Sequence, residues 1–439
     1  MLNLQNPIYT EYFSINKIKE VFSEKIVSSP AVGADGTKMR KFQDQLDLEI
    51  ETIIRKTKNR TYKFTRYKQK LISKGAKKYP RIISIPTIRD RLTLRIICEI
   101  LRKSFRNSHS ILPNQVIKKI KKEYKKDSMS FVRIDIEDFY PSINHKLLME
   151  CLRPQIWQEE ILELIEKAIK NQAETDFANK GIPQGLSISN ILASIYLEDF
   201  DAEMSRQWNY FRYVDDMLIV CPNEEAQEAF ETVKNKLVFL KLNCHELNKE
   251  KGKSYICNVS DGTEYLGYNI SLSGIRVRKS SFNKMFNNIL KVFSQHKYNS
   301  NETRFIWKLN LKISGCIFRN KNFGWMFFFS EIDDLEQLHI LDAFIKKQLS
   351  NRGMEHLIGK VKTFVKTYRE IRSRRAVSTY FPNFDEFDET DMKNELTQLK
   401  GIDFVKSIPL GELENSFYRA IKHEVSQLER DLSEVFHYQ

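Results

Sequence analysis

In the stretch Tyr213-Val214-Asp215-Asp216-Met217-Leu218, two acids stand between residues that favour β-strands. The wider run 211–221 therefore predicts a strand, a tight turn and a second strand, with both carboxylates at an exposed turn. Upstream, Val132-Arg133-Ile134-Asp135-Ile136 predicts a short buried strand with a third carboxylate near its end. An acidic pair also makes a good turn, so the pair alone does not distinguish a structural role from a chemical one.

The three carboxylates suit one kind of chemistry if the two strand segments lie side by side. Mg²⁺ prefers oxygen ligands and binds through a few carboxylates plus substrate phosphates. Two such ions about 4 Å apart activate an attacking hydroxyl and hold a triphosphate in nucleotidyl transfer. Asp135, Asp215 and Asp216 are therefore the candidate catalytic residues and metal ligands.

The sequence around these strands favours the chemical explanation. Between them lies Gly181-Ile182-Pro183-Gln184-Gly185-Leu186-Ser187-Ile188-Ser189-Asn190. Its glycines allow the backbone to approach a ligand closely, and Gln184 can hydrogen-bond a nucleotide edge. The aromatic Tyr140 follows Asp135 by five positions. These three segments resemble motifs A, B and C of reverse transcriptases, in the family's order and spacing.

The resemblance covers roughly residues 30 to 280 and is closest to group II intron, retron and related bacterial enzymes. The segment 81–91 is similar to their fingers, 247–251 to motif D and 265–268 to motif E. The resemblance implies a right-hand polymerase with two Mg²⁺ ions and deoxynucleoside triphosphates as substrates. The residues that it places at the site, besides the three aspartates, are Ile136 with the metal ions and Lys74, Lys78, Arg81, Tyr140, Gln184, Gly185 and Lys251 with the nucleotide.

The implied roles differ among these residues. Asp135 and Asp215 are the main metal ligands, and Asp216 is a weaker or indirect one. Arg81 and one of the lysines 74, 77 and 78 clamp the triphosphate. Tyr140 is a steric gate against the ribose 2′-hydroxyl, which favours DNA as product. Lys251 is a general-acid candidate beside the pyrophosphate, although a solvated surface lysine remains an alternative.

Charge and composition point to a nucleic-acid partner. The 439 residues contain 71 Lys and Arg against 57 Asp and Glu, a formal charge of +14. Such an excess favours a polyanion, although a merely basic surface is the alternative. Between Glu51 and Asp90 stand 13 basic residues and no acid, which predicts a phosphate-facing surface. The six scattered cysteines, the absence of a signal-peptide pattern and the lack of a run of ~20 apolar residues predict a cytoplasmic protein without a membrane partner.

The pattern of apolar residues predicts an α+β fold with an antiparallel sheet backed by helices. The expected helices span 38–58, 89–105, 158–171, 187–204 and 224–240, and the expected strands span 67–73, 81–85, 131–136, 254–257 and 265–270. Beyond residue 282 strand signals fade and helical periodicity takes over. The expected domains are fingers (1–91), an antiparallel-sheet palm with finger elements (92–278), a helical thumb (279–350) and an α-helical C-terminal extension (351–439).

The remaining features bear on the kind of reverse transcriptase. No endonuclease, RNase H or zinc motif follows residue 280, and the segment 304–315 resembles the thumb of bacterial defence-associated enzymes. The smaller enzyme of type 3 defence systems is the expected subtype. It implies a dedicated noncoding RNA as template, a DNA product, a second reverse transcriptase as partner and an oligomer. The alternatives are a retroelement-derived or domesticated enzyme and a non-catalytic RNA-binding subunit.

The tail beyond the thumb predicts a docking surface for RNA or a partner chain. It carries four clustered arginines, Arg369, Arg372, Arg374 and Arg375, and an acidic aromatic segment at 380–391 that looks like a linker or an exposed loop. Arginine clusters favour phosphate because the guanidinium binds two oxygens at once. The alternative is that these arginines pair with the acids at 385–391 in the same chain.

Overall fold

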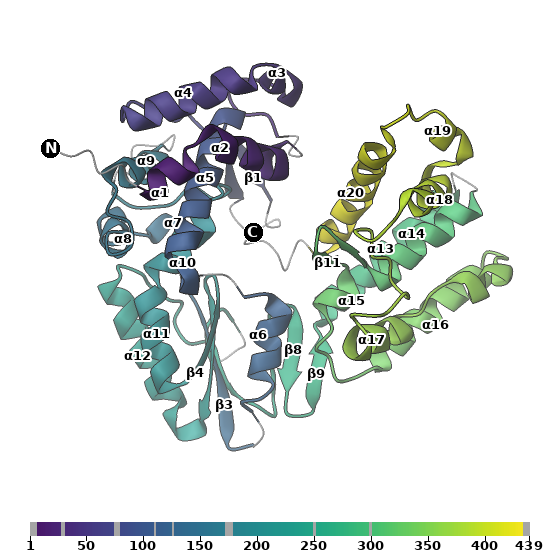
Figure 1. The fold of residues 1–439 in the computed structure, drawn as a ribbon. Helices are drawn as coiled ribbons and strands as arrows, with labels where there is room; N and C mark the ends of the chain where they lie inside the picture. Colours follow the sequence, from purple (N-terminus) through teal and green to yellow (C-terminus); the bar gives the residue numbers. More distant parts are fainter. Residues whose placement is uncertain are drawn as a thin grey trace. The chain divides into compact units, whose positions relative to one another are not determined.

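The computed structural model describes residues 7–27, 31–73, 80–108, 111–124, 127–171, 179–248, 252–297 and 301–432. The chain forms two compact units (Figure 1). Unit 1 contains residues 1–111 and 130–256, and unit 2 contains residues 112–129 and 257–438. Each unit has its own buried core, and each is described separately below.

Unit 1 begins with helices and a basic hairpin. The helix α5 (Ile88–Ser104) is its buried centre, and Thr87 caps the first turn by accepting a hydrogen bond from the Asp90 amide. The strands β1 (Lys68–Ile72) and β2 (Arg81–Ile85) pair antiparallel, with Ile72 opposite Arg81. The preceding helices are α1 (Pro7–Tyr12), α2 (Ile15–Val21), η1 (Phe22–Ile26), α3 (Met39–Asp44) and α4 (Leu46–Lys58).

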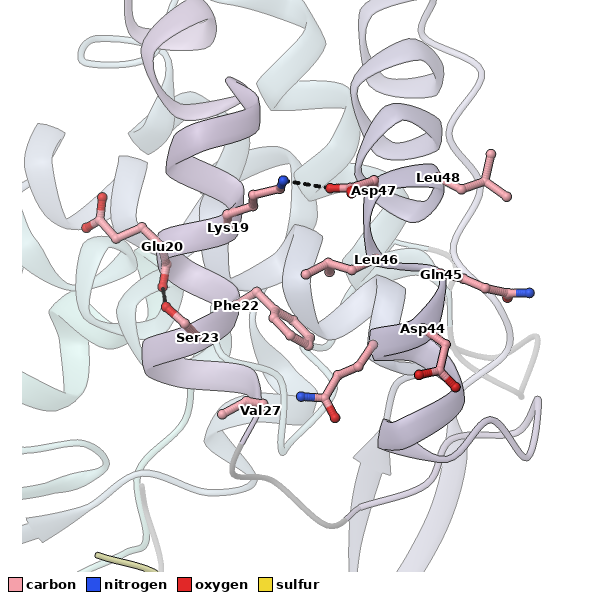
Figure 2. Close-up of a pocket in the computed structure, with 11 residues that line it drawn as sticks. Lys19, Glu20, Phe22, Ser23, Val27, Asp44, Gln45, Leu46, Asp47 and Leu48 are labelled. Atoms are coloured by element: carbon pink, nitrogen blue, oxygen red, sulfur yellow. Dashed lines mark hydrogen bonds and ion pairs between the residues drawn. The ribbon is translucent and has the colours of Figure 1, made fainter. Parts of the chain in front are cut away.

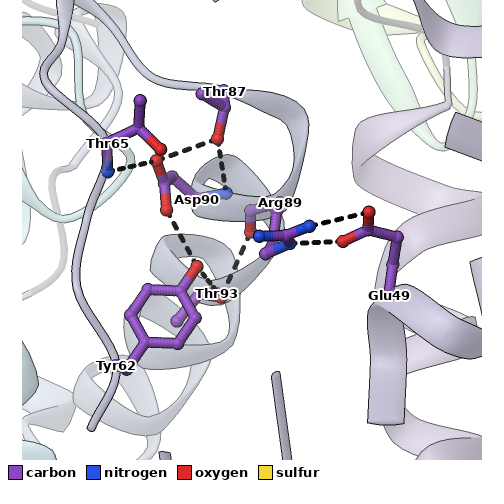
Figure 3. A network of polar contacts seen from close by, with 7 residues as sticks. All are labelled: Glu49, Tyr62, Thr65, Thr87, Arg89, Asp90 and Thr93. Carbon is purple, nitrogen blue, oxygen red and sulfur yellow. Dashed lines mark hydrogen bonds and ion pairs between the residues drawn. The ribbon is translucent and has the colours of Figure 1, made fainter. Parts of the chain in front are cut away.

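A buried carboxylate joins the extended segment before β1 to the start of α5 (Figure 3). Asp90 accepts hydrogen bonds from the Tyr62 hydroxyl at 2.8 Å, the Thr65 amide at 3.0 Å and the Thr87 hydroxyl at 2.8 Å. Burial raises the pKa of Asp90, while these hydrogen bonds lower it. Because a buried carboxylate is tolerated only when its oxygens are satisfied, this network fixes the path of the chain into the basic hairpin.

The second half of unit 1 is built around a four-stranded sheet in the order β4-β5-β3-β6. Its strands are β3 (Met129–Asp135), β4 (Asn209–Tyr213), β5 (Asp216–Pro222) and β6 (Tyr255–Asn258). Apolar side chains of β3 and β5 are fully buried, as expected for central strands covered by helices. The accompanying helices are η2 (Arg106–Ser108), α7 (Phe139–Ser142), α8 (His145–Leu152), α9 (Glu159–Lys170), α10 (Ser189–Tyr196), α11 (Glu198–Gln207), η4 (Asn223–Glu225) and α12 (Ala226–Phe239).

Unit 2 combines two small antiparallel sheets with helices. Its strands are β7 (Thr263–Tyr265), β8 (Tyr268–Ser271), β9 (Gly274–Val277), β10 (Cys316–Phe318) and β11 (Lys321–Phe323). Its helices are α6 (Pro113–Ile120), α13 (Lys279–Lys297), α14 (Glu302–Ser314), α15 (Trp325–Phe328), α16 (Glu336–Ser350), η5 (Glu355–Lys360), α17 (Phe364–Ser373), α18 (Glu389–Lys400), α19 (Ile402–Lys406) and α20 (Leu413–Asp431). No helix of the described residues is long and apolar enough to cross a bilayer.

One core of unit 2 joins α14 to α18 and α20. Trp307 and Leu311 of α14 pack with Phe384, with α18 and with Phe417 of α20. The expectation that 380–391 is a linker or exposed loop is therefore wrong, because Phe381 and Phe384 are 2% and 0% exposed. The parallel bridge of Ile317 to Asn383 draws this segment against β10 and buries its rings.

The α+β class and its antiparallel pairing are confirmed, and four elements differ from expectation. The expected helix at 38–58 is two helices, interrupted at Gln45. The expected helix at 187–204 is two helices, interrupted at Leu197. The expected strand at 265–270 is a hairpin whose turn residues, Leu266 and Gly267, have φ of 49° and 83°. The β10–β11 hairpin lies where only helix was expected. The domain boundaries at 91, 278 and 350 stay predictions.

Candidate active site

The turn between β4 and β5 presents the acidic pair. The register pairs Tyr213 with Asp216, which leaves Val214 and Asp215 as the turn. Val214 has a φ of 60°, a conformation that costs a β-branched residue energy and persists only where its surroundings enforce it. Arg212 supplies part of that support, since its Nη1 donates to the Val214 carbonyl at 2.9 Å and its Nε donates to Asp201 at 2.7 Å.

A main-chain bond brings the end of β3 to this turn. The amide of Ile136 donates to the carbonyl of Asp215 at 3.1 Å. Asp135 and Asp215 therefore lie on neighbouring backbone segments. The Asp135 amide donates to the buried hydroxyl of Ser254 at 3.2 Å. The Asp135 carbonyl accepts from the amide of His245 at 3.0 Å. The structure therefore brings the predicted carboxylates together and holds their backbone rigidly.

Electrostatic strain is concentrated on Asp215. Burial, followed by the neighbouring carboxylates of Asp135 and Asp216, raises the pKa of Asp215 to about 7. Its Oδ1 is buried and has no hydrogen-bond partner among the described residues. Two neighbouring negative charges and one unsatisfied oxygen make Asp215 a group that a cation would stabilise.

Asp216 is bound differently from Asp215. The Arg133 guanidinium donates to both of its oxygens, Nε at 3.1 Å and Nη2 at 2.9 Å. The Asp216 side chain is only 14% exposed, so the expectation of an exposed turn is wrong for this residue. Arg133 also lies over the Tyr255 ring, with its Cζ 6.0 Å from the ring centre. This paired position accords with the weaker, indirect metal role expected for Asp216.

Two basic side chains lie against Asp135. Lys253 donates to Oδ1 of Asp135 at 2.8 Å. The His245 Nε2 lies 3.3 Å from the same oxygen, and its Nδ1 lies 3.2 Å from Glu137. Asp135 is 7% exposed, whereas the Lys253 side chain is 59% exposed. An exposed lysine on a flexible four-carbon stem can give way to a divalent ion that binds the same carboxylate.

The donor set fits oxygen-preferring cations. Within the described residues, no three His, Cys, Asp or Glu side chains are already gathered in metal-binding geometry. Arg133 is paired with Asp216, and Lys253 is paired with Asp135. Asp135 and Asp215 nevertheless offer buried carboxylate oxygens at one place, which is the chemistry that Mg²⁺ selects. The metal roles of Asp135, Ile136, Asp215 and Asp216 stay predictions.

Tyr140 lies in the same electrostatic environment. Its hydroxyl donates to Oδ1 of Asn190 at 2.7 Å, and the ring is 5% exposed. Burial, then the charge of Asp215, raises the pKa of Tyr140, while the charges of Arg212 and Arg81 lower it. The hydroxyl of the predicted gate is therefore held by Asn190 and lies within the electrostatic influence of Asp215 and of Arg81, the first residue of β2.

The glycine-rich loop packs on β2. The Ser84 amide donates to the Gln184 carbonyl at 2.7 Å. Gly185 has a φ of 103°, and a Cβ there would lie 2.8 Å from the Ser84 carbonyl oxygen and 2.7 Å from Ile83 Cγ2. Glycine is thus required by both conformation and space. This contact sets the loop with Gln184 against the strand that begins at Arg81.

Some predicted site residues lie outside the described residues, and some residues at the site were not predicted. Lys74, Lys77, Lys78 and Lys251 lie outside the described residues, so their roles stay predictions. Residues that sequence reasoning missed are Arg133, Asn190, Asp201, Arg212, His245, Lys253 and Ser254. Arg133 had a signal, since its position two residues before Asp135 puts both side chains on one face of a strand.

A separate cavity of unit 1, of about 930 Å³, is lined by α2, η1, α3 and α4 (Figure 2). Its polar side chains are largely paired with near neighbours. Lys19 lies 2.7 Å from Asp47, and the Ser23 hydroxyl donates to the Glu20 carbonyl at 2.8 Å. The ion pair is 47% and 76% exposed, so it contributes little to stability. None of the expected site residues lines this cavity.

Comparison with known proteins agrees with the geometry. Residues 68–270 match the family model described as reverse transcriptase (RNA-dependent DNA polymerase). They form a reverse transcriptase domain. The match spans β1, the sheet with its aspartates and β8, and the antiparallel α+β architecture agrees with the right-hand polymerase fold that the sequence predicts. The domain is that of an RNA-directed DNA polymerase, an enzyme.

The reverse transcriptase domain has curated relatives in bacteria. Protein YkfC of Escherichia coli is 23% identical over 342 residues, which cover 65% of this chain and 86% of the relative. The group II intron-encoded protein LtrA of Lactococcus lactis is 31% identical over 166 residues, 35% of this chain and 28% of LtrA. Among solved structures, Candida albicans telomerase with a telomeric RNA fragment has 13% identity and a TM-score of 0.42, covering 91% of this chain and 68% of that one.

Proposed function

We propose that the chain is a reverse transcriptase that adds deoxynucleotides to a primer at two Mg²⁺ ions. The observation that carries this proposal is the buried, unsatisfied carboxylate of Asp215 beside Asp135 inside a reverse transcriptase domain. Bound metal would activate the attacking hydroxyl and neutralise the triphosphate charge. Asp135 and Asp215 would hold it, with Ile136 beside them and Asp216 in a secondary position.

The remaining residues would bind and orient the nucleotide. Arg81, together with Lys74 or Lys78, would clamp the triphosphate as charged donors. Gln184 and Gly185 would present the loop edge and backbone to the base or template, and Tyr140 would close the space beside the sugar. Lys251 would lie by the pyrophosphate. Positioning and charge neutralisation would then supply most of the acceleration.

The biological setting that we propose is antiphage defence. The RNA template would be a dedicated noncoding RNA. It would be copied into DNA in the cytoplasm by an oligomer that includes a second reverse transcriptase. The formal charge of +14 supports a nucleic-acid partner. A retroelement-derived enzyme is the second candidate, because a group II intron-encoded protein is among the relatives. A non-catalytic subunit is disfavoured by the complete set of carboxylates.

We also propose that the tail is a docking surface for RNA or a partner chain. The contacts of its arginines bear on this proposal. These arginines do not pair with the acids at 385–391 among the described contacts. Arg372 lies 3.1 Å from Glu331, Arg374 lies 3.9 Å from Glu370, and Arg375 lies over the Phe327 ring. Asp385 instead accepts from the amides at 319 and 320. Truncation near residue 349 would cut through a shared core, so point variants are the sounder test.

Purified protein tests the polymerase proposal directly. Supplied with a primed RNA template and dNTPs, it should extend the primer in Mg²⁺. EDTA should stop extension, because without metal ions the anionic carboxylates would repel the triphosphate. Sequencing the DNA made from co-purifying RNA distinguishes the settings. A single host noncoding RNA as template favours defence, whereas intron RNA ends favour the retroelement candidate. No extension on any primed template with Mg²⁺ or Mn²⁺ would contradict the polymerase proposal.

Tyr140→Ala should raise ribonucleotide incorporation relative to deoxynucleotide by roughly tenfold or more. The ring is buried and fixed by Asn190, so its loss opens space for a 2′-hydroxyl; a pocket contact of this size discriminates by about 1–3 kcal/mol. Single-nucleotide extension with matched rNTP and dNTP pairs measures the ratio. Tyr140→Phe keeps the ring and serves as the control. An unchanged ratio in the alanine variant would show that another residue forms the gate.

A further inference from the structure

Unit 2 contains a cavity that the polymerase chemistry does not use. It has a volume of about 520 Å³ and lies between α14, α18 and the segment at 378–387. That volume is within the roughly 300–1,000 Å³ of small-molecule sites. Every residue that lines it belongs to unit 2 and is described by the structure.

The cavity holds two opposite charges that are not joined to each other. The Trp307 Nε1 donates to Oε1 of Glu395 at 2.6 Å, and among the described residues no donor is bound to the second oxygen. Lys362 forms no ion pair or side-chain hydrogen bond within the described structure; its Nζ lies 5.4 Å from the Tyr380 ring centre. Burial raises the pKa of Glu395 and lowers that of Lys362. Both groups are therefore partly desolvated and have unused hydrogen-bonding capacity.

Aromatic side chains form the walls. Trp307, Phe381 and Phe387 line the cavity with the two charges. Phe387 is half-buried, and its ring is also packed on Phe384 and Phe417, which fixes its position. Rigid aromatic walls with a few converging polar groups are the usual surroundings of a planar heterocycle, and unpaired bases stack on such rings.

We propose that this cavity binds a guanine base. A carboxylate accepts only, and guanine offers two adjacent donors, N1–H and N2–H, to its oxygens. Adenine, cytosine and uracil each place an acceptor beside the donor, which Glu395 would repel. The guanine O6 or N7 acceptor would face the ammonium of Lys362. The site is additional to the polymerase centre and does not depend on it.

The charges also indicate how the base enters. The positive charge of Lys362 would repel a cationic side chain from a protein partner. A neutral base can hydrogen-bond both Lys362 and Glu395. At the rim, exposed Glu386 accepts from Asn383, and Asp391 belongs to the capping box of α18. These acids oppose phosphate inside the cavity. The sugar and phosphate would therefore remain outside, as for a free guanosine nucleotide or an unpaired guanine of a nucleic-acid strand.

Isothermal titration of the full chain with guanosine, in EDTA and without dNTPs, tests the site. Guanosine should bind at least tenfold more tightly than adenosine, cytidine or uridine. Glu395→Gln keeps an oxygen for Trp307 but replaces one acceptor with a donor, so it should abolish the preference. Lys362→Met should weaken binding about tenfold. Lys366→Ala, which removes the neighbouring ammonium on the Tyr380 ring without lining the cavity, should change nothing.

Two further experiments distinguish a free guanine nucleoside from a guanine in a strand, and a guanine base from a cationic ligand. Competition by a single-stranded RNA with one unpaired guanine, but not by its adenine counterpart, would identify the base of a strand; absence of competition would identify a free nucleoside. Equal binding of all four nucleosides, or guanosine binding that Glu395→Gln leaves unchanged, would overturn the proposal. So would binding of agmatine that exceeds guanosine binding and becomes stronger in Lys362→Met. The polymerase proposal is tested separately by primer extension, and none of these binding results bears on it.

Discussion

Asp135→Asn and Asp215→Asn should each lower the rate of DNA synthesis by about a thousandfold or more. Each change keeps the size of the side chain and removes one negative charge from the place where metal would bind. Loss of a metal ligand removes several kcal/mol of charge stabilisation in the transition state, and each 1.36 kcal/mol corresponds to a factor of ten. Primer extension at saturating dNTP and Mg²⁺ measures the loss.

Asp138→Asn is the matched control for this experiment. Asp138 is three residues from Asp135, is exposed, and makes no side-chain capping bond at the start of α7. Its φ of 41° is also tolerated by asparagine. The control should retain nearly full activity. If Asp215→Asn keeps more than a tenth of the wild-type rate, the assignment of the metal ligands is wrong.

Asp216 needs separate treatment because of its ion pair with Arg133. Neutralising Asp216 leaves a largely buried guanidinium without its carboxylate, and breaking such a pair destabilises a protein by about 3–5 kcal/mol. Replacing Asp215 and Asp216 together would therefore mix lost chemistry with lost stability. Single variants at Asp135 and Asp215 avoid that ambiguity.

The sequence could predict the parts of the site that are local. Asp135, Gly185 and Asp215 belong to short segments that act through backbone geometry and strand ends, and they lie in the strand, loop and turn that were expected. Tyr140 lies in the short helix α7, for which the sequence analysis predicted no element. The pairing of Arg133 with Asp216 spans 83 positions, and that of Lys253 with Asp135 spans 118. Strand alternation gives the face of Arg133, but only the order of the sheet gives its partner.

The largest error in the fold has the same origin. The segment at 380–391 is rich in acids, and composition alone predicts exposure. Its burial depends on β10, a three-residue strand too short to produce a clear pattern, and on α20, which supplies Phe417. The composition of a segment indicates only its local preference for exposure. The burial of Phe384 depends on elements about 65 residues before it and about 30 after it.

Asp215→Asn should also stabilise the metal-free protein at pH 8, and this gain should disappear near pH 4. The folded pKa of Asp215 is about 7, against an ordinary value of 3.8. Because the folded state holds the proton more tightly, ionising Asp215 destabilises the fold progressively as pH rises from about 4 to about 7. Three pKa units correspond to about 4 kcal/mol as an upper order of magnitude. Asparagine is never ionised and escapes this penalty.

Thermal unfolding in EDTA at pH 4.5, 6 and 8 measures the effect as the difference between variant and wild type. A gain of a few kcal/mol should raise the melting temperature by several degrees at pH 8, at about 2–4 °C per kcal/mol for a unit of this size. Adding Mg²⁺ at pH 8 should narrow the difference, since only the wild type gains from neutralising the cluster. Asp138→Asn should show no trend with pH. A difference that is constant with pH, or a variant less stable than the wild type at pH 8, would show that the folded protein does not strain this carboxylate.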